Sequence, residues 1–205
     1  MKKQWWIATL ISLAPLAAWA GSEPEAEEPG IPRITVLPPQ RVLTLTVQGD
    51  PDAVAGGAFK KLFRAFYANA DKAEKRHVGS AMARWPLAQM DSAKQVWRGE
   101  YALPISEGFP AAPAGEIRDT VWERGLVAEI LHVGTYDSEA ADIAALQGFL
   151  ARNGYTTNGY HEEVYLKGPG MMIKGDPRKY RTLIRYQVDR VGEAPDPIAK
   201  QTTDR

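Results

Sequence analysis

The chain carries the same order of predicted elements twice, and this repeat constrains the fold more than any other feature. Each half predicts a strand, a helix and two further strands, from a two-residue alternation of apolar side chains in the strands and a helical spacing between them. The predicted ranges are 41–49, 50–70, 79–88 and 96–106 in the first half, and 125–134, 135–154, 160–166 and 180–188 in the second.

Matching residues recur at nearly constant separations. The pairs and their separations are Gly49/Gly134 (85), Leu62/Leu146 (84), Phe66/Leu150 (84), Asn69/Asn153 (84), Gly79/Gly159 (80), Trp85/Tyr165 (80) and Tyr101/Tyr186 (85). Small drifts in separation fit insertions in loops. Because neither half can bury a sheet face alone, we expect the two to pair about a pseudo-twofold axis. The predicted fold is α+β: a duplicated βαββ unit forming an antiparallel sheet, with helices on one face and a central cleft.

Both helices have recognisable ends and apolar faces. Asp50 followed by Pro51 predicts the start of the first helix, because Asp caps and Pro suits the first turn. Asp137 or Ser138 is the expected cap of the second helix, and Asn153-Gly154 its end. The apolar residues at helical spacing are Ala55, Phe59, Leu62, Phe63 and Phe66 in the first, and Ile143, Leu146, Phe149 and Leu150 in the second.

The two ends of the chain differ in composition from its centre. Residues 1–20 combine Lys2 and Lys3 with an apolar run and end in Ala18-Trp19-Ala20, which predicts a secretory signal peptide cut after Ala20. Residues 21–40 are rich in Pro and Glu and predict a flexible tether, and 191–205 predict a flexible tail. The predicted folded domain therefore covers 41–190, and the predicted location is periplasmic or secreted.

The composition argues against several classes of function. The chain has no cysteine, so it has neither disulfides nor thiol chemistry, and its three histidines are not at metal-ligand spacing. We expect no metal, no cofactor and no membrane span after signal cleavage. Without residues 1–20 the chain has 23 basic and 25 acidic residues, so it lacks the basic excess typical of nucleic-acid binding. The sequence does not indicate an oligomeric state.

One predicted strand carries an unusual set of polar side chains. In the run YHEEVYL (160–166), alternation places His161, Glu163 and Tyr165 on one face and Glu162, Val164 and Leu166 on the other. Val164 and Leu166 can fill a core. The opposite face, a carboxylate beside an aromatic ring, is either an open solvated surface or the floor of a ligand pocket.

Residues 125–188 resemble the GyrI-like small-molecule-binding family, whose domain also forms the effector-binding part of multidrug-responsive bacterial regulators. The resemblance rests on Gly134-x-Tyr136, on Asn153-Gly154-Tyr155, on Glu163-x-Tyr165-Leu166, and on Pro177 before Arg181-Thr182 and the last strand. It implies that Glu163 lies at the base of an aromatic cleft and meets cationic, lipophilic ligands. A carboxylate among rings is poorly hydrated, so it gains from pairing with a delocalised cation.

The other candidate ligand-binding residues are aromatic or lie beside Glu163. Tyr136 is either a pocket wall or a packing residue at the entry to the helix. His161 either orients Glu163 or lies exposed at an edge. Ala83 occupies the repeat position of Glu163, so a site near the axis would have one carboxylate. The remaining candidates, which alternatively belong to the core, are Tyr165, Trp85, Trp97 and Tyr101.

Three functions are compatible with these features. The favoured one is periplasmic binding of a hydrophobic, cationic small molecule. The second is a hydrolase that opens strained electrophilic rings, a chemistry that the resemblance implies, with Glu163 directing water and Tyr136 or Tyr165 donating a proton. The third is an envelope module that binds another protein through the acidic tether and the segment Met171-Met172-Ile173.

Overall fold

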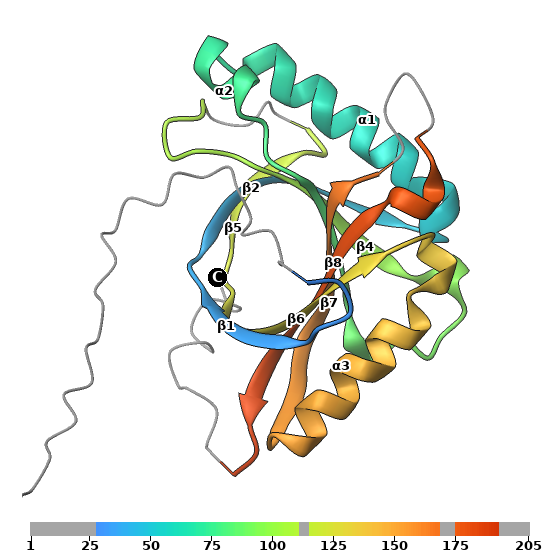
Figure 1. The fold of residues 1–205 in the computed structure, drawn as a ribbon. Coiled ribbons are helices and arrows are strands. Elements are labelled where there is room, and N and C mark those ends of the chain that lie inside the picture. Colours follow the sequence, from blue (N-terminus) through green and yellow to red (C-terminus); the bar gives the residue numbers. More distant parts are fainter. Residues whose placement is uncertain (1–27, 111–114, 169–174, 193–205) are drawn as a thin grey trace, which may run out of the picture.

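The computed structural model describes residues 28–110, 115–168 and 175–192, which form an α+β fold, as predicted (Figure 1). The strands are β1 (Arg33–Leu37), β2 (Gln40–Gln48), β3 (Ala81–Pro86), β4 (Arg98–Pro104), β5 (Arg118–Trp122), β6 (Gly125–Val133), β7 (Tyr155–Lys167) and β8 (Arg181–Arg190). The helices are α1 (Pro51–Asn69), α2 (Lys72–Arg76) and α3 (Ala140–Arg152), with short 3₁₀ turns η1 (Leu87–Gln89), η2 (Lys94–Val96), η3 (Tyr136–Ser138) and η4 (Pro177–Lys179).

All eight described strands belong to one antiparallel sheet, in the order β1-β6-β8-β7-β3-β4-β2-β5. The order is symmetric about the β7–β3 pair: β7, β8 and β6 on one side correspond to β3, β4 and β2 on the other. Each half contains a strand, a long helix and two strands, which is the predicted order. The gene-level duplication itself stays a prediction.

The two end strands of the sheet, β1 and β5, are each followed in the chain by a strand near the opposite end, β2 and β6 respectively. Leu37 at the end of β1 pairs with Gly125, and Gln40 at the start of β2 pairs with Trp122, so the register is unchanged across Pro38-Pro39. Proline has no N–H to donate, which interrupts the ladder at this corner. The sheet therefore curls strongly, and β1, β2 and β5 close the ring visible in Figure 1.

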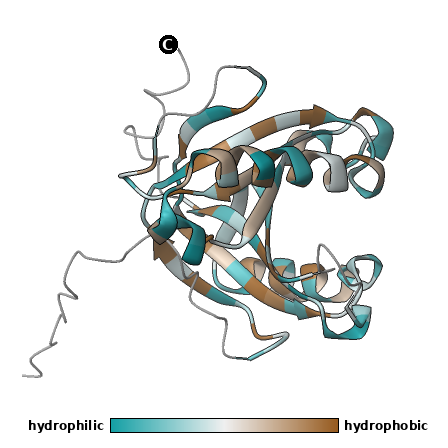
Figure 2. Cartoon of the chain, turned by 90° about the horizontal axis from the view of Figure 1, so that it is seen from above, coloured by the Kyte–Doolittle hydropathy of each residue, from teal (hydrophilic) through white to brown (hydrophobic). Residues whose placement is uncertain are grey.

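Both long helices pack on one face of the sheet, as predicted. Helix α1 lies against β2 and β4, and α3 lies against β6 and β7. Apolar and polar residues alternate along strands and helices (Figure 2), so each helix buries one stripe. The fully buried side chains under the helices are Leu62 and Phe66 from α1 and Leu146 and Leu150 from α3.

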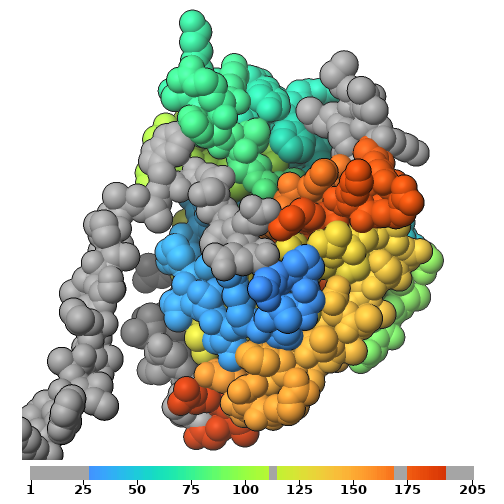
Figure 3. Space-filling model, in the orientation of Figure 1, coloured from blue at the N-terminus to red at the C-terminus, as the bar shows by residue number. Residues whose placement is uncertain are grey.

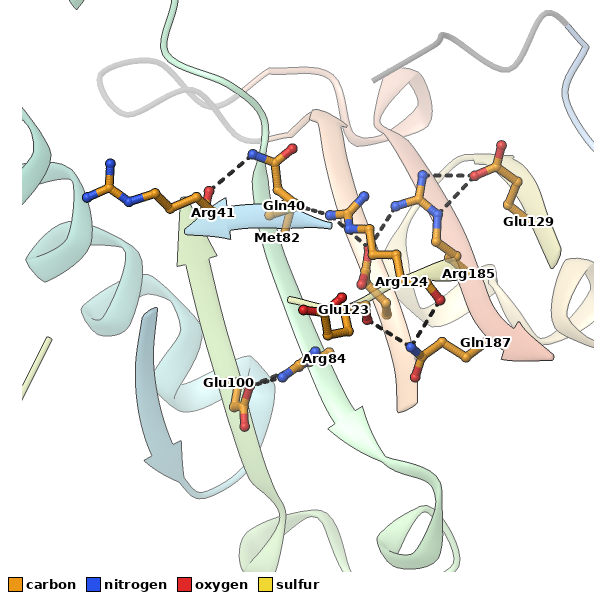
Figure 4. A network of polar contacts seen from close by, with 11 residues as sticks. Gln40, Arg41, Met82, Arg84, Glu100, Glu123, Arg124, Glu129, Arg185 and Gln187 are labelled. Carbon is orange, nitrogen blue, oxygen red and sulfur yellow. Dashed lines mark hydrogen bonds and ion pairs between the residues drawn. The ribbon is translucent and has the colours of Figure 1, made fainter. Parts of the chain in front are cut away.

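The opposite, concave face of the sheet combines an apolar cluster with buried ion pairs. Arg185 is 1% exposed and donates to Glu129 at 2.8 and 2.9 Å and to Glu162 at 2.7 Å (Figure 4). Arg33 also pairs with Glu129, at 2.6 Å. The guanidinium of Arg84 lies between the Trp122 and Tyr160 rings, 4.1 and 4.2 Å from their centroids. Glu129 and Glu162 on this face therefore have arginine partners, and Glu100 pairs with Arg84.

The predicted tether is wrong at its C-terminal end, because residues 33–37 form strand β1. This strand pairs with β6 over its whole length and lies on the outside of the folded body, in contact with it (Figure 3). The pairing partner lies about 90 residues later in the chain, so local composition did not reveal it. Residues 21–27, the predicted signal peptide 1–20 and most of the predicted tail 191–205 lie outside the described residues.

Other local differences are small. Strand β5 and helix α2 were not predicted. The first helix begins at Pro51 with Asp50 as its cap, as predicted. The second helix begins at Ala140 rather than after Asp137 or Ser138, because the Ser138 hydroxyl donates to the Thr135 carbonyl at 2.7 Å instead of capping. Within the described ranges no helix is long and apolar enough to cross a membrane.

Candidate functional site

The candidate site is centred on Glu163, at the junction between the two halves. Strand β7 pairs there with β3, and Glu163 lies directly opposite Ala83, its expected repeat mate. Ala83 is fully buried and carries only a methyl group. The sheet alternation places the Glu163 side chain on the helix-bearing face, where it is 14% exposed. This strand pair therefore carries one carboxylate, that of Glu163.

Both oxygens of the Glu163 carboxylate accept hydrogen bonds from neighbours on the same strand. His161 Nε2 lies 2.9 Å from Oε1, and the Tyr165 hydroxyl donates to Oε2 at 2.7 Å. These residues lie two positions before and after Glu163, so the alternation of β7 brings all three together. The arrangement holds the carboxylate plane in one orientation.

His161 links Glu163 to β8. Its Nδ1 atom lies 2.8 Å from the Tyr186 hydroxyl, and the side chain is 2% exposed, so the exposed-edge interpretation of His161 is wrong. A neutral imidazole satisfies both contacts by accepting from Tyr186 at Nδ1 and donating to Glu163 from Nε2. In that arrangement the Glu163 carboxylate accepts two hydrogen bonds and has no arginine or lysine partner among the described residues.

Aromatic rings from both halves surround this carboxylate. Phe59 on α1 meets the Tyr101 and Tyr165 rings edge-on, with centroids 5.3 and 5.5 Å apart. Trp85 lies 6.1 Å from Tyr101 and 5.9 Å from His161. From the second half, Tyr136 lies 5.7 Å from Tyr165. The sequence therefore brings its predicted aromatic residues into one continuous cluster.

The members of the cluster differ in exposure. Tyr101 and Trp85 are fully or almost fully buried, whereas Tyr136 is 37% exposed. Trp97 contacts the Trp85 ring and donates its indole N–H to the Ser92 carbonyl, so it packs against Trp85 and is itself held in place. Tyr136 is accordingly an outer residue of the cluster, and Tyr101 an inner one.

A glycine on β4 makes room for the Trp85 indole. A Cβ atom at Gly99 would lie 2.6 Å from Trp85 Nε1, closer than any real contact. The indole therefore lies directly over the β4 backbone. Trp85 Nε1 and the Tyr101 hydroxyl are both buried and have no hydrogen-bond partner among the described residues.

The structure adds four residues that the sequence analysis missed: Phe59 as a wall rather than core alone, Tyr186, Glu139 and Thr182. Tyr186 was visible as the repeat mate of Tyr101, but its contact with His161 depends on the β7–β8 register. Glu139 is 7% exposed, which its place in a polar run did not suggest. Burial, and then the charge of Glu163, raise the pKa of Glu139 to about 9.

The tyrosine hydroxyls around Glu163 stay protonated over a wide pH range. Burial, followed by the negative charge of Glu163, raises the pKa of Tyr101, Tyr136 and Tyr186 to about 12. The same two causes raise the pKa of Tyr165 well above its usual value. These groups therefore act as neutral hydrogen-bond donors.

No cluster of metal-ligating side chains occurs within the described ranges. A cavity of about 440 Å³ lies apart from the Glu163 cluster, along the free part of β2, and is lined by Thr46, Lys61, Arg98 and Arg118 among others. Its walls are mostly exposed polar side chains. The aromatic and carboxylate chemistry is concentrated at Glu163 instead.

Known structures share this fold. A hydrolase from Listeria innocua superimposes with a TM-score of 0.66 at 17% identity, over 80% of this chain and 94% of that one. An uncharacterised conserved protein from Listeria innocua gives 0.67 at 17% identity, over 80% and 94%. The C-terminal domain of EcmrR gives 0.56 at 17% identity, over 78% and 98%. At this identity the likenesses show the fold alone.

No curated protein matches the sequence. The sequence profile of the GyrI-like small molecule binding domain matches residues 32–187, which include β1 and every strand and helix of the curled sheet up to most of β8. The match covers both halves and therefore the whole Glu163 cluster. The chain belongs to the GyrI-like small-molecule-binding domain family.

Proposed function

We propose that the chain binds a hydrophobic, cationic small molecule, with Glu163 as the anionic anchor and the surrounding rings as walls. The observation that carries this proposal is the set of partners around the Glu163 carboxylate. Its carboxylate has hydrogen bonds from His161 and Tyr165, but no arginine or lysine among the described residues lies within ion-pair distance.

A carboxylate in this environment gains more from a cationic ligand than a solvated one does. Burial weakens its hydration, and the faces of Tyr165 and Tyr136 add cation–π attraction for a delocalised positive charge. The rings also supply apolar area for a lipophilic ligand. The outer position of Tyr136 marks the side of the cluster that reaches solvent.

The proposal is tested with tetraphenylphosphonium as a cationic probe and triphenylphosphine oxide as a neutral aromatic comparison, by calorimetry or tryptophan quenching. Removing one desolvated ion pair costs about 1–3 kcal/mol, which is roughly a 5- to 150-fold rise in Kd. Glu163→Gln should show that rise for the phosphonium and little change for the oxide. Glu116→Gln removes the same charge at an exposed position and is the matched control. Equal phosphonium affinity in wild type and Glu163→Gln would reject the anchor.

The hydrolase alternative meets an obstacle in the proton donors assigned to it. The raised pKa of Tyr136 and Tyr165 makes both hydroxyls weaker acids than a free tyrosine, so neither donates a proton readily near neutral pH. Binding is therefore the function that the geometry supports best. Turnover of an epoxide panel that is abolished in Glu163→Gln would reverse this preference.

We also propose that the chain acts outside the cytoplasm. The support is the sequence of residues 1–20, with its basic start, apolar run and small residues before Gly21. Cell fractionation followed by N-terminal sequencing should recover a chain starting at Gly21 in the periplasm or medium. Recovery of a cytoplasmic chain that retains residues 1–20 would contradict this location.

A further inference from the structure

A second carboxyl group, that of Glu139, lies in the same environment as Glu163. Glu139 follows the η3 turn and precedes the first residue of α3, three positions after Tyr136. Its side chain is 7% exposed, and its Oε1 atom is buried without a hydrogen-bond partner among the described residues. Such a group is rare in folded proteins, because an unpaired buried oxygen costs free energy.

Glu139 lies near the Glu163 cluster, beside Thr182 on β8. The Thr182 hydroxyl is also buried and makes no hydrogen bond of full geometry, but it lies close enough to the Glu139 carboxyl to donate to it weakly and lower its pKa. Thr182 pairs across the sheet with Tyr165. The charge of Glu139 in turn raises the pKa of Tyr136, Tyr165 and Tyr186. Glu139 therefore acts on Tyr165, which contacts Glu163 directly, and on Tyr186, which contacts it through His161.

Three charged groups act on Glu139, and they lie on β7, α3 and η2. Burial has the largest effect on its pKa, followed by the charge of Glu163 on β7, and both raise it. The Thr182 hydroxyl on β8 lowers the pKa, Asp142 on α3 raises it, and Lys94 on η2 lowers it. The balance favours the neutral acid at physiological pH. A neutral carboxylic acid has an O–H to donate, whereas an ionised one has none.

We propose that Glu139 is a second ligand-contacting group of the Glu163 site, whose buried carboxyl donates a hydrogen bond to an oxygen acceptor on the ligand. The ligand class is then a lipophilic cation that carries an ether, carbonyl or ester oxygen near its positive centre. This inference rests on the proposed function, and it specifies the ligand that the site selects.

The pairing of one ionised and one neutral carboxyl sets the charge of the site. At neutral pH the site carries a single negative charge, which suits a monocation. Above about pH 9 the ionisation of Glu139 adds a second negative charge, so simple cations should bind more tightly. A Gln at position 139 keeps a donor but cannot ionise.

The test uses two cationic probes that differ in acceptors: rhodamine 6G, with ester and ether oxygens, and tetraphenylphosphonium, with none. At pH 7, Glu139→Met should weaken rhodamine 6G binding about fivefold or more, as loss of one buried hydrogen bond implies. Tetraphenylphosphonium affinity should change less than about twofold, because it makes no such bond. Glu139→Gln should keep rhodamine 6G binding close to wild type.

The pH dependence supplies a second readout. Wild type should bind tetraphenylphosphonium more tightly at pH 10 than at pH 7, and Glu139→Gln should not. Equal weakening of both probes in Glu139→Met, or a pH-dependent gain that persists in Glu139→Gln, would overturn the role of Glu139. The Glu163→Gln variant tests the cation site separately. If both probes bind it as tightly as wild type, Glu163 is not the anchor, whatever the result for Glu139. Circular dichroism confirms that each variant is folded.

Discussion

Glu162 and Glu163 are neighbours on β7, yet they lie in opposite electrostatic environments. Glu162 faces the concave side of the sheet, where Arg185 donates to it at 2.7 Å and Arg124 lies 3.4 Å away. Glu163 faces the helices, where its partners are His161 and Tyr165. One residue step changes the face of the strand and with it the entire set of neighbours.

The comparison separates charges that hold the fold together from a charge available to a ligand. On the concave face, Glu129 and Glu162 are saturated by arginines from β1, β8 and the β5–β6 turn, so these charges connect distant strands of the curled sheet. On the helix face, the Glu163 carboxylate is fixed in orientation but not neutralised. A saturated ion pair has little to offer a ligand, whereas an oriented, uncompensated carboxylate does.

The largest expected effect is loss of stability in Arg185→Met. This change leaves Glu129 and Glu162 with fewer positive partners at 0 and 7% exposure, and breaking a buried ion pair by removing one partner costs about 3–5 kcal/mol. Urea unfolding followed by circular dichroism measures it. Arg178→Met, at a guanidinium that is 87% exposed and paired with Asp176, should change stability by less than about 0.5 kcal/mol. Similar midpoints for the two variants would show that the concave network is not structural.

The fold was largely predictable because its information is local and repeated. The alternation in 41–49 and 125–134 and the helical spacing of Phe59, Leu62 and Phe66 predict β2, β6 and α1 to within a few residues. Strand β1 was missed because it depends on pairing with β6 far along the chain, while its neighbouring prolines resemble a linker. Nonlocal pairing of this kind leaves little trace in composition.

The next prediction compares the two adjacent glutamates directly. Glu162→Gln removes the charge that faces Arg185 and should destabilise the fold by about 1–3 kcal/mol. Glu163→Gln should change stability by less than about 1 kcal/mol, because the Tyr165 hydroxyl and the His161 tautomer can reorient toward an amide. Unfolding midpoints of the two single variants at one pH give the answer. A larger loss for Glu163→Gln would mean that its carboxylate holds the sheet together and is not reserved for a ligand.

The candidate site was only partly predictable. Alternation alone placed His161, Glu163 and Tyr165 together, and the repeat placed Ala83 opposite Glu163. The second carboxyl escaped prediction, because nothing in the run Asp137-Ser138-Glu139 distinguishes the buried acid from its exposed neighbours. Its burial follows from where the η3 turn meets β8, which is a property of the packed chain. Sequence patterns predict which face of a helix or strand a side chain lies on better than they predict which side chains are buried where two elements meet.

The last prediction, which separates the two faces most finely, is a gain in stability. Because the pKa of Glu139 is raised in the folded protein, folding takes up a proton between the unfolded pKa near 4.5 and the folded value of about 9. Stability should therefore fall as pH rises through this window. Glu139→Gln cannot ionise, so it should equal wild type below pH 4.5 and exceed it by at least about 1 kcal/mol near pH 8. Unfolding curves at pH 4, 6 and 8 test this. A constant difference across these pH values would mean that Glu139 is ionised in the folded protein, and the helix face would then carry two uncompensated charges rather than one charge and one neutral donor.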